Sequence, residues 1–83
     1  MANTELAKSK TVALFSLMQL AEPCLRLMAQ SGERSERYFD AYTVACRTVL
    51  ERYMPEILER VSASEMADQL LKDALPTHPG WKR

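Results

Sequence analysis

Few residues of the sequence could take part in nucleophilic catalysis or metal binding, and they lie far apart along the chain. The only histidine, His78, lies in the segment PTHPGWKR, and the two cysteines, Cys24 and Cys46, are far from it along the chain. Nucleophilic or general-base catalysis requires a base beside a nucleophile, and a zinc site requires Cys and His ligands at short spacings. The sequence also lacks a glycine-rich phosphate loop. We therefore expect no enzymatic activity, no metal site and no cofactor.

The two cysteines could form one disulfide bond at most. Both fall on the apolar faces of predicted helices, and buried free thiols are typical of proteins in a reducing compartment. We therefore expect Cys24 and Cys46 to be free and inert.

The apolar segment TVALFSLMQLA at 11–21 has the length of a signal peptide and follows two lysines. Signal peptidase requires small residues at the −1 and −3 positions, and cleavage after Ala21 would place Gln19 at −3. No apolar run approaches the ~20 residues of a membrane span. We therefore expect an uncleaved cytoplasmic chain without a membrane partner.

The charged residues give little sign of a nucleic-acid partner. The chain has 11 basic and 11 acidic residues and a net charge of zero, whereas phosphate-binding proteins present a basic surface. Arg34 and Arg37 could contact phosphate or an acidic protein, but Glu33, Glu36 and Asp40 lie among them. We expect this segment to be a solvated turn and do not expect nucleic acid as the partner.

The composition predicts an all-α protein with a single domain. Of 83 residues, 47% are hydrophobic, and two glycines and four prolines leave little room for the turns of a β-sandwich. Ala, Leu, Met, Glu and Arg, which are abundant here, are good helix formers. We expect one helical domain at 1–75, formed by a long antiparallel helical hairpin and a short C-terminal helix, and a non-helical tail at 76–83.

The first long helix is expected to have Asn3 or Thr4 as its N-cap. Two adjacent apolar seams with 4-3-4-3 spacing give it a face about 180° wide. One neighbouring helix cannot cover so wide a face, so this helix should contact two or three neighbours, as in a bundle. The seams consist of Ala13, Leu17, Leu20, Cys24 and Leu27, and of Leu14, Met18, Ala21, Leu25 and Met28.

Pro23 falls on the polar side of this helix, and both seams keep their phase across it. A proline on the solvent side removes one backbone hydrogen bond and bends the helix around the core. We therefore expect one continuous helix bent at Pro23. The alternative is two helices that meet at Glu22, because a residue before proline disfavours the helical conformation.

The segment SGERS predicts a tight turn, with Gly32 just past the first helix and Ser35 as the N-cap of the second. The second helix carries an apolar stripe with 3-4-3-4 spacing. Pro55 either bends this helix, as Pro23 bends the first, or begins a new helix at its N1 position. The stripe consists of Phe39, Tyr42, Cys46, Val49 and Tyr53.

A last short helix is predicted from the capping-box spacing of Ser62 and Glu65. Pro76 should end it. Its apolar residues are Met66, Ala67, Leu70, Leu71, Ala74 and Leu75.

Three groups of apolar residues are candidates for contacts with a partner. Val12 and Phe15 make 11–16 apolar on nearly all sides, so the last helix or a second chain must cover it. Trp81, the only tryptophan, is a fold-back anchor, a free end or a docking peptide. The third group could form a recognition surface or a core with wet hydroxyl groups; it consists of Tyr38, Phe39, Tyr42 and Tyr53.

Together these features predict a non-catalytic protein–protein interaction module that dimerises into a helical bundle. Its partners would be a second copy of itself and a larger protein that it regulates, inhibits or adapts, as small phage and plasmid proteins do. The alternative is a helical nucleic-acid-binding regulator, since the layout is similar to that of small dimeric four-helix bundles such as Rop. No residue motif is shared with those proteins, so no family is assigned.

Overall fold

The structure, a computed structural model, describes residues 2–81, with side chains from Lys8 onward, and is helical without strands over that range. This confirms the prediction of an all-α chain. The elements are α1 (Ala2–Ser31), α2 (Glu36–Tyr53), a 3-10 helix (Pro55–Glu59), α3 (Ala63–Ala74) and a second 3-10 helix (Leu75–Thr77).

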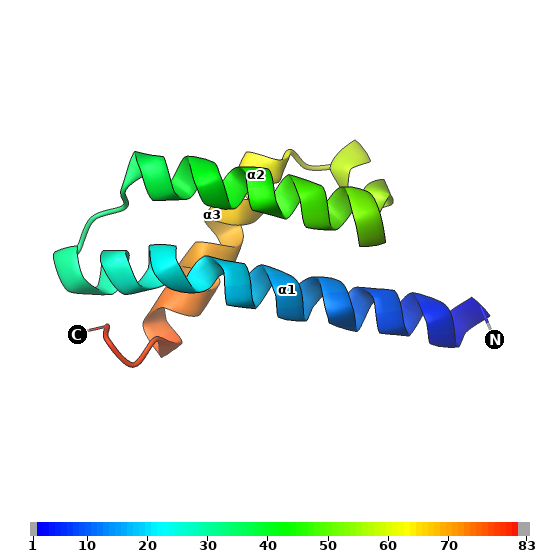
Figure 1. Cartoon of the computed structure of the whole chain (residues 1–83), viewed down its shortest axis with the longest axis horizontal. Coiled ribbons are helices and arrows are strands. Elements are labelled where there is room, and N and C mark those ends of the chain that lie inside the picture. The colour runs from blue at the N-terminus through cyan, green and yellow to red at the C-terminus, as the bar shows by residue number, and fades with distance from the viewer. Residues whose placement is uncertain (1, 82–83) are drawn as a thin grey trace.

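The three α-helices pack against one another. Figure 1 shows that α2 runs back beside α1 after a short turn, while α3 crosses behind both helices. The N-terminal part of α1 extends past the end of α2, so the molecule is elongated, with extents of 45 × 22 × 17 Å. One flank of the α1–α2 pair is therefore covered by α3, and the opposite flank is open.

α1 continues through Pro23 without a break. The Pro23 side chain is exposed, so its ring does not displace core residues. Proline has no N–H, and the carbonyl oxygen of Gln19 therefore loses its usual donor four residues on. The alternative of two helices that meet at Glu22 is wrong.

Pro55 does not bend α2, so the prediction of a second helix bent at a proline is wrong. α2 ends at Tyr53, and Met54 follows with φ −144° and ψ 58°, outside the helical region. The ring of a proline crowds the preceding residue out of the helical conformation, and Met54 has left that conformation. Pro55 instead occupies the first turn of the 3-10 helix, where its missing N–H has no cost. The alternative of a new helix at Pro55 is confirmed.

The turn between α1 and α2 forms as its residues predict. Gly32 has φ +77°, a conformation that favours glycine, and its N–H donates to the Met28 carbonyl at 2.8 Å. Ser35 is the N-cap of α2, and its hydroxyl accepts a hydrogen bond from the Tyr38 N–H at 3.4 Å. The short turn holds the end of α1 against the start of α2.

The predicted N-cap of α3 forms, whereas α1 begins before its two predicted N-cap residues. Ser62 caps α3 and accepts from the Glu65 N–H at 3.2 Å, as predicted. α1 begins at Ala2, upstream of Asn3 and Thr4, and the side chains of both lie outside the described ones. The last helix ends at Ala74, one residue before the predicted end at Leu75. The tail predicted to be non-helical from 76 onward begins within a 3-10 helix at Leu75–Thr77, so that part of the prediction is wrong.

The core is built largely of small side chains. Among the described residues, eight of the fifteen that are buried and apolar are Ala or Cys. Small side chains allow helix backbones to approach closely and leave room for only a few large ones. The buried residues are Ala13, Leu17, Ala21, Cys24, Leu25, Ala29, Phe39, Tyr42, Cys46, Val49, Leu50, Ala63, Ala67, Leu71 and Ala74.

One buried hydrogen bond joins α1 to α2 in this core. The Tyr42 hydroxyl donates to the Leu17 carbonyl oxygen at 2.8 Å. The hydroxyl therefore remains satisfied although the Tyr42 side chain is buried. The bond sets the position of α2 along α1.

We expect Pro23→Ala to preserve the fold and not to lower the melting temperature. Proline inside a helix costs ~3 kcal/mol relative to alanine, although a chain adapted to proline should regain only part of that difference. Thermal unfolding followed by circular dichroism measures the effect, with Gln19→Ala on the same exposed side as the control. An unfolded Pro23→Ala variant would contradict the continuous helix.

Tyr42→Phe should lower the free energy of unfolding by about 1 kcal/mol, because it removes a buried hydrogen bond without opening a large cavity. Tyr53→Phe, on the same helix with a half-buried ring, is the matched control and should change stability less. Chemical denaturation measures the free energy of unfolding of both variants and of the wild type. An equal loss in the two variants would show that the hydrogen bond to Leu17 contributes little.

Candidate protein-binding surfaces

Large apolar side chains on the outside of α1 form the first candidate surface. We call Val12, Leu14, Phe15 and Met18 the N-terminal apolar surface; all four are exposed, and Phe15 is 63% exposed. Farther along the same side of α1, Leu25 and Ala29 are buried. α3 crosses α1 at an angle and does not follow its N-terminal part (Figure 1).

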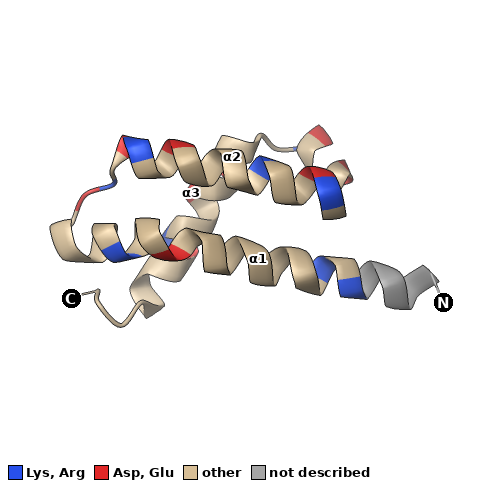
Figure 2. Ribbon diagram, in the orientation of Figure 1, with Lys and Arg blue, Asp and Glu red and all other residues tan. Residues whose placement is uncertain are grey.

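The charges around this surface are sparse and of opposite sign at its two ends. Figure 2 shows that α1 carries no charge between Lys10 and Glu22. Lys8, Thr11, Phe15, Met18 and Glu22 follow one another at 3-4-3-4 spacing, which places them along one stripe of the helix. The stripe therefore has a cation at one end, apolar side chains in the middle and an anion at the other end.

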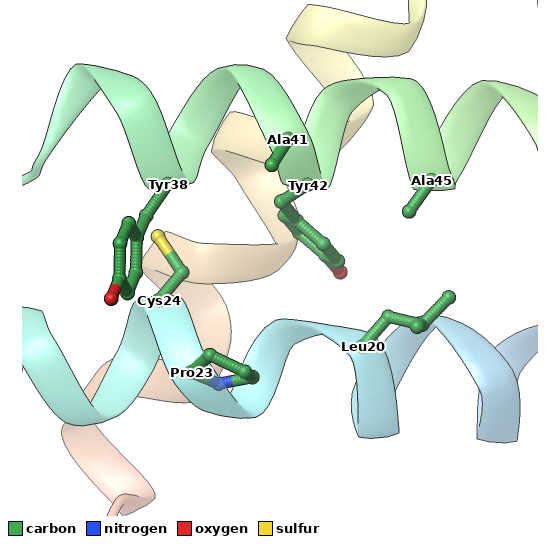
Figure 3. A pocket seen from close by; sticks show the side chains of 7 residues that line it. All are labelled: Leu20, Pro23, Cys24, Tyr38, Ala41, Tyr42 and Ala45. Carbon is green, nitrogen blue, oxygen red and sulfur yellow. The ribbon is translucent and has the colours of Figure 1, made fainter.

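A groove between α1 and α2, on the flank away from α3, forms the second candidate surface (Figure 3). We call it the α1–α2 groove. Its middle section has a volume of about 360 Å³, and the sections at its two ends measure about 350 and about 200 Å³. The middle section shares Leu20 with one end and Pro23 and Tyr38 with the other, so the three sections adjoin one another. The middle is lined by Leu20, Pro23, Cys24, Tyr38, Ala41, Tyr42 and Ala45.

Polar and basic groups lie at the two ends of the α1–α2 groove. Arg26 and Gln30 line one end, and Gln19 and Arg52 line the other. None of the described residues that line the three sections is acidic. The groove is thus apolar in the middle and positive at both ends, with Arg26 on the α1 rim and Arg52 on the α2 rim.

The aromatic residues predicted to share one recognition surface are divided between core and groove. Phe39 and Tyr42 are buried, because α3 and α1 cover the stripe on which they lie; Phe39 is therefore wrong as a contact residue, and Tyr42 reaches only the groove floor. Tyr38 is 43% exposed and forms a groove wall, and Tyr53 lines the Arg52 end. Sequence periodicity did not identify Leu20, Ala41 and Ala45 as groove residues.

Arg34 of the turn and Arg37 of α2 have different environments. Arg34 forms ion pairs with Asp68 of α3 at 2.7 Å and with Glu36 at 3.3 Å, and its guanidinium lies 3.9 Å from the centre of the Phe39 ring. Arg34 therefore ties the turn to α3 and is engaged within the fold, whereas Arg37 is exposed.

The C-terminal tail folds back onto α1. The Gly80 N–H donates to His78 Nδ1 at 3.0 Å, so His78 Nε2 carries the proton and donates to Glu22 Oε1 at 3.1 Å. The hydrogen bond from His78 holds the pKa of Glu22 below its ordinary value. The His78 side chain is only 11% exposed, and Trp81 beyond it is half-buried. The tail thus packs against α1, as the fold-back alternative for Trp81 requires.

The cysteines are poorly placed for reactivity. Cys24 and Cys46 are both free and buried, and burial raises the pKa of both thiols, which disfavours the reactive thiolate. Burial likewise raises the pKa of Tyr42. Among the residues that the structure describes, no group of three or more His, Cys, Asp or Glu side chains is placed to hold a metal ion.

One described helix has the length and composition of a membrane span. The Lys8–Ser31 part of α1 covers 24 residues. An 18-residue window within it has a mean hydropathy of 1.3, and 33% of that window is buried in the fold. By length and composition, α1 contradicts the expectation that no apolar run approaches a membrane span. Core helices of soluble proteins and N-terminal signal sequences share these properties, so they do not by themselves indicate a membrane.

Comparison with known proteins gives no match: no family model fits the sequence, and no curated protein or solved structure is significantly similar to it.

Two carboxylates should make stability depend on pH. Hydrogen bonds from His78 and from Lys72 hold the pKa values of Glu22 and Asp68 below their ordinary values. Their contribution is therefore present above about pH 4 and lost as the pH falls through the folded-state pKa values. Between about pH 5 and about pH 3, the melting temperature of Glu22→Gln/Asp68→Asn should fall less than that of the wild type. Glu51→Gln, at an exposed position, is the control, and an equal fall in all three proteins would contradict the prediction.

Proposed function

We propose that this chain is a non-catalytic protein-binding module of the cytoplasm that dimerises and acts as a small regulator, inhibitor or adaptor of a larger protein. The observation that carries the proposal is the distribution of apolar side chains. Small residues make up about half of the core, whereas Leu14, Phe15, Met18 and Leu20 are exposed. Apolar residues in contiguous patches on the outside of a small protein mark interaction surfaces.

The proposed dimer joins two hairpins through their N-terminal apolar surfaces into a helical bundle. If two copies of α1 pack antiparallel and cross at Phe15, Lys8 of each copy lies opposite Glu22 of the partner subunit. Such a two-fold arrangement pairs opposite charges at both ends and buries Phe15 and Met18 in the middle. Glu22 also accepts a hydrogen bond from His78 and pairs with Arg26 at 3.5 Å, but a carboxylate has about four acceptor positions.

We expect the protein to be a dimer at micromolar concentration and Phe15→Glu to be monomeric, because the variant would place two carboxylates in the apolar centre of the interface. Val44→Glu makes the same kind of exchange at a residue of α2 that is 67% exposed and should remain dimeric. Sedimentation equilibrium measures both variants. A monomeric wild type, or a Phe15→Glu variant that remains dimeric, would contradict this interface.

Binding to a larger protein is tested by affinity capture with the full chain in an extract of its source cells, with nuclease treatment as a control. A specifically captured protein that is retained after nuclease treatment and at high salt supports the proposal. Recovery of RNA or DNA alone, with binding that weakens steeply as salt rises, would favour the nucleic-acid-binding alternative instead.

A further inference from the structure

We infer that the α1–α2 groove binds an amphipathic helix of the larger partner, one with an apolar stripe flanked by two acidic side chains. This inference rests on the proposed function and deepens it by assigning the surface and the chemistry of the partner. It commits to a helix of another protein, and a second copy of this chain is an outcome of the test.

The shape of the groove fits a helix laid along it. The three sections adjoin one another in a row along α1 and α2, and the described residues that line the middle section carry no charge. Ala41 and Ala45 are small, so a helix backbone can approach α2 closely at these positions. Leu20 and Tyr38 project from opposite sides of the middle section (Figure 3) and provide apolar contact on either side of the bound helix.

The charges determine which helix fits. Two arginines and no described acidic residue line the groove, so acidic groups on the partner would complement both ends. Arg52 lies 5.4 Å from the centre of the Tyr53 ring and makes no ion pair within the described residues. Arg26 pairs with Glu22 at 3.5 Å, but the Arg26 side chain is 64% exposed, and such a surface pair contributes little.

The same charges disfavour a second copy of this chain in the groove. A two-fold axis perpendicular to the groove would place Arg52 of one copy beside the partner's Arg26, and a two-fold axis along the groove would place equivalent arginines together. Either arrangement brings arginines of the two copies together, and the groove lining contributes no acidic residue to separate them. The groove is therefore the surface for a different protein, and the N-terminal apolar surface remains for the second copy.

The positions of the arginines predict the spacing of the acidic residues. Arg52 lies at the level of Ser16 and Gln19, and Arg26 lies about 13 Å farther along α1 at 1.5 Å per residue. Two acidic residues of a bound helix should thus be about nine positions apart. At 100° per residue, nine positions place them on opposite flanks of the stripe, as the opposite rims of the groove require.

A pair of synthetic peptides tests this inference on the full-length protein. The first is a fluorescent amphipathic helix of about 18 residues with a leucine stripe flanked by two glutamates about nine positions apart, and the second has lysines at those two positions. Fluorescence anisotropy should show that the glutamate peptide binds at least about tenfold more tightly, the ratio expected from ~1.4 kcal/mol.

Variants of the protein then locate the bound peptide. Ala41→Glu places a carboxylate at an exposed position of the groove and should abolish binding of the glutamate peptide, whereas Val44→Glu, on the same helix outside the lining, should not. Arg26→Glu/Arg52→Glu should reverse the preference toward the lysine peptide, a result that general damage to the fold would not produce.

Three results would overturn the inference: equal binding of the two peptides, equal binding by wild type and Ala41→Glu, or dissociation of the dimer by Ala41→Glu, which would make the groove the self-association surface. The captured protein distinguishes this inference from the proposed function. If Ala41→Glu still retains that protein, the groove assignment is wrong and the protein-binding function stands. If the wild-type chain captures no protein, the proposed function itself fails.

Discussion

The close approach of three helices on small side chains is the constraint on which the other features of this molecule depend. Ala13 and Ala21 of α1, and Ala67 of α3, are almost completely buried, and their size sets how near the helices lie. At this separation the Tyr42 hydroxyl can reach the Leu17 carbonyl across the interface. Phe15 does not belong to this core, since it lies on the outer side of α1 and is 63% exposed.

This distribution limits the stability of the isolated chain. Burying a Leu, Met or Phe side chain contributes about 1.5–3 kcal/mol, whereas a buried Ala contributes much less because it removes little apolar area from water. The chain compensates with contacts between its ends: Arg34 joins the turn to α3, and His78 joins the tail to α1. A partner that covers Phe15 or Leu20 would add the apolar burial that the monomer lacks.

Local rules predicted much of the fold from the sequence. The phase of the apolar residues across Pro23 predicted a continuous α1, and Gly32 and Ser35 predicted the turn. Pro55 was ambiguous because a proline at N1 and a proline in a helix have similar local patterns. The burial of α1 could not be read from its two seams, since the crossing angle of α3 decides that Leu25 is covered and Leu14 is not.

The candidate surfaces were only partly visible in the sequence. Val12 and Phe15 were identifiable because they are large apolar residues on a polar side of α1, but Ala41 and Ala45 carry no such signal, since alanine is common in any helix. A signal for the groove does exist in α2: Tyr38, Ala41, Ala45 and Thr48 follow one another at 3-4-3 spacing without a charge. α2 thus has an uncharged stripe beside the stripe that packs in the core, and such a double stripe is expected of a helix that makes contacts on two of its faces.

The two surfaces can act at the same time because they lie on different sides of α1. Phe15 and Leu20 are five residues apart, which separates them by about 140° around the helix axis. A dimer formed through Phe15 would leave both α1–α2 grooves open and facing away from its two-fold axis. Two identical grooves on one particle could engage two helices of an oligomeric partner, and the second contact would form at a high effective concentration. In such an assembly, a change that weakens the dimer would also weaken partner binding without altering any residue of the groove.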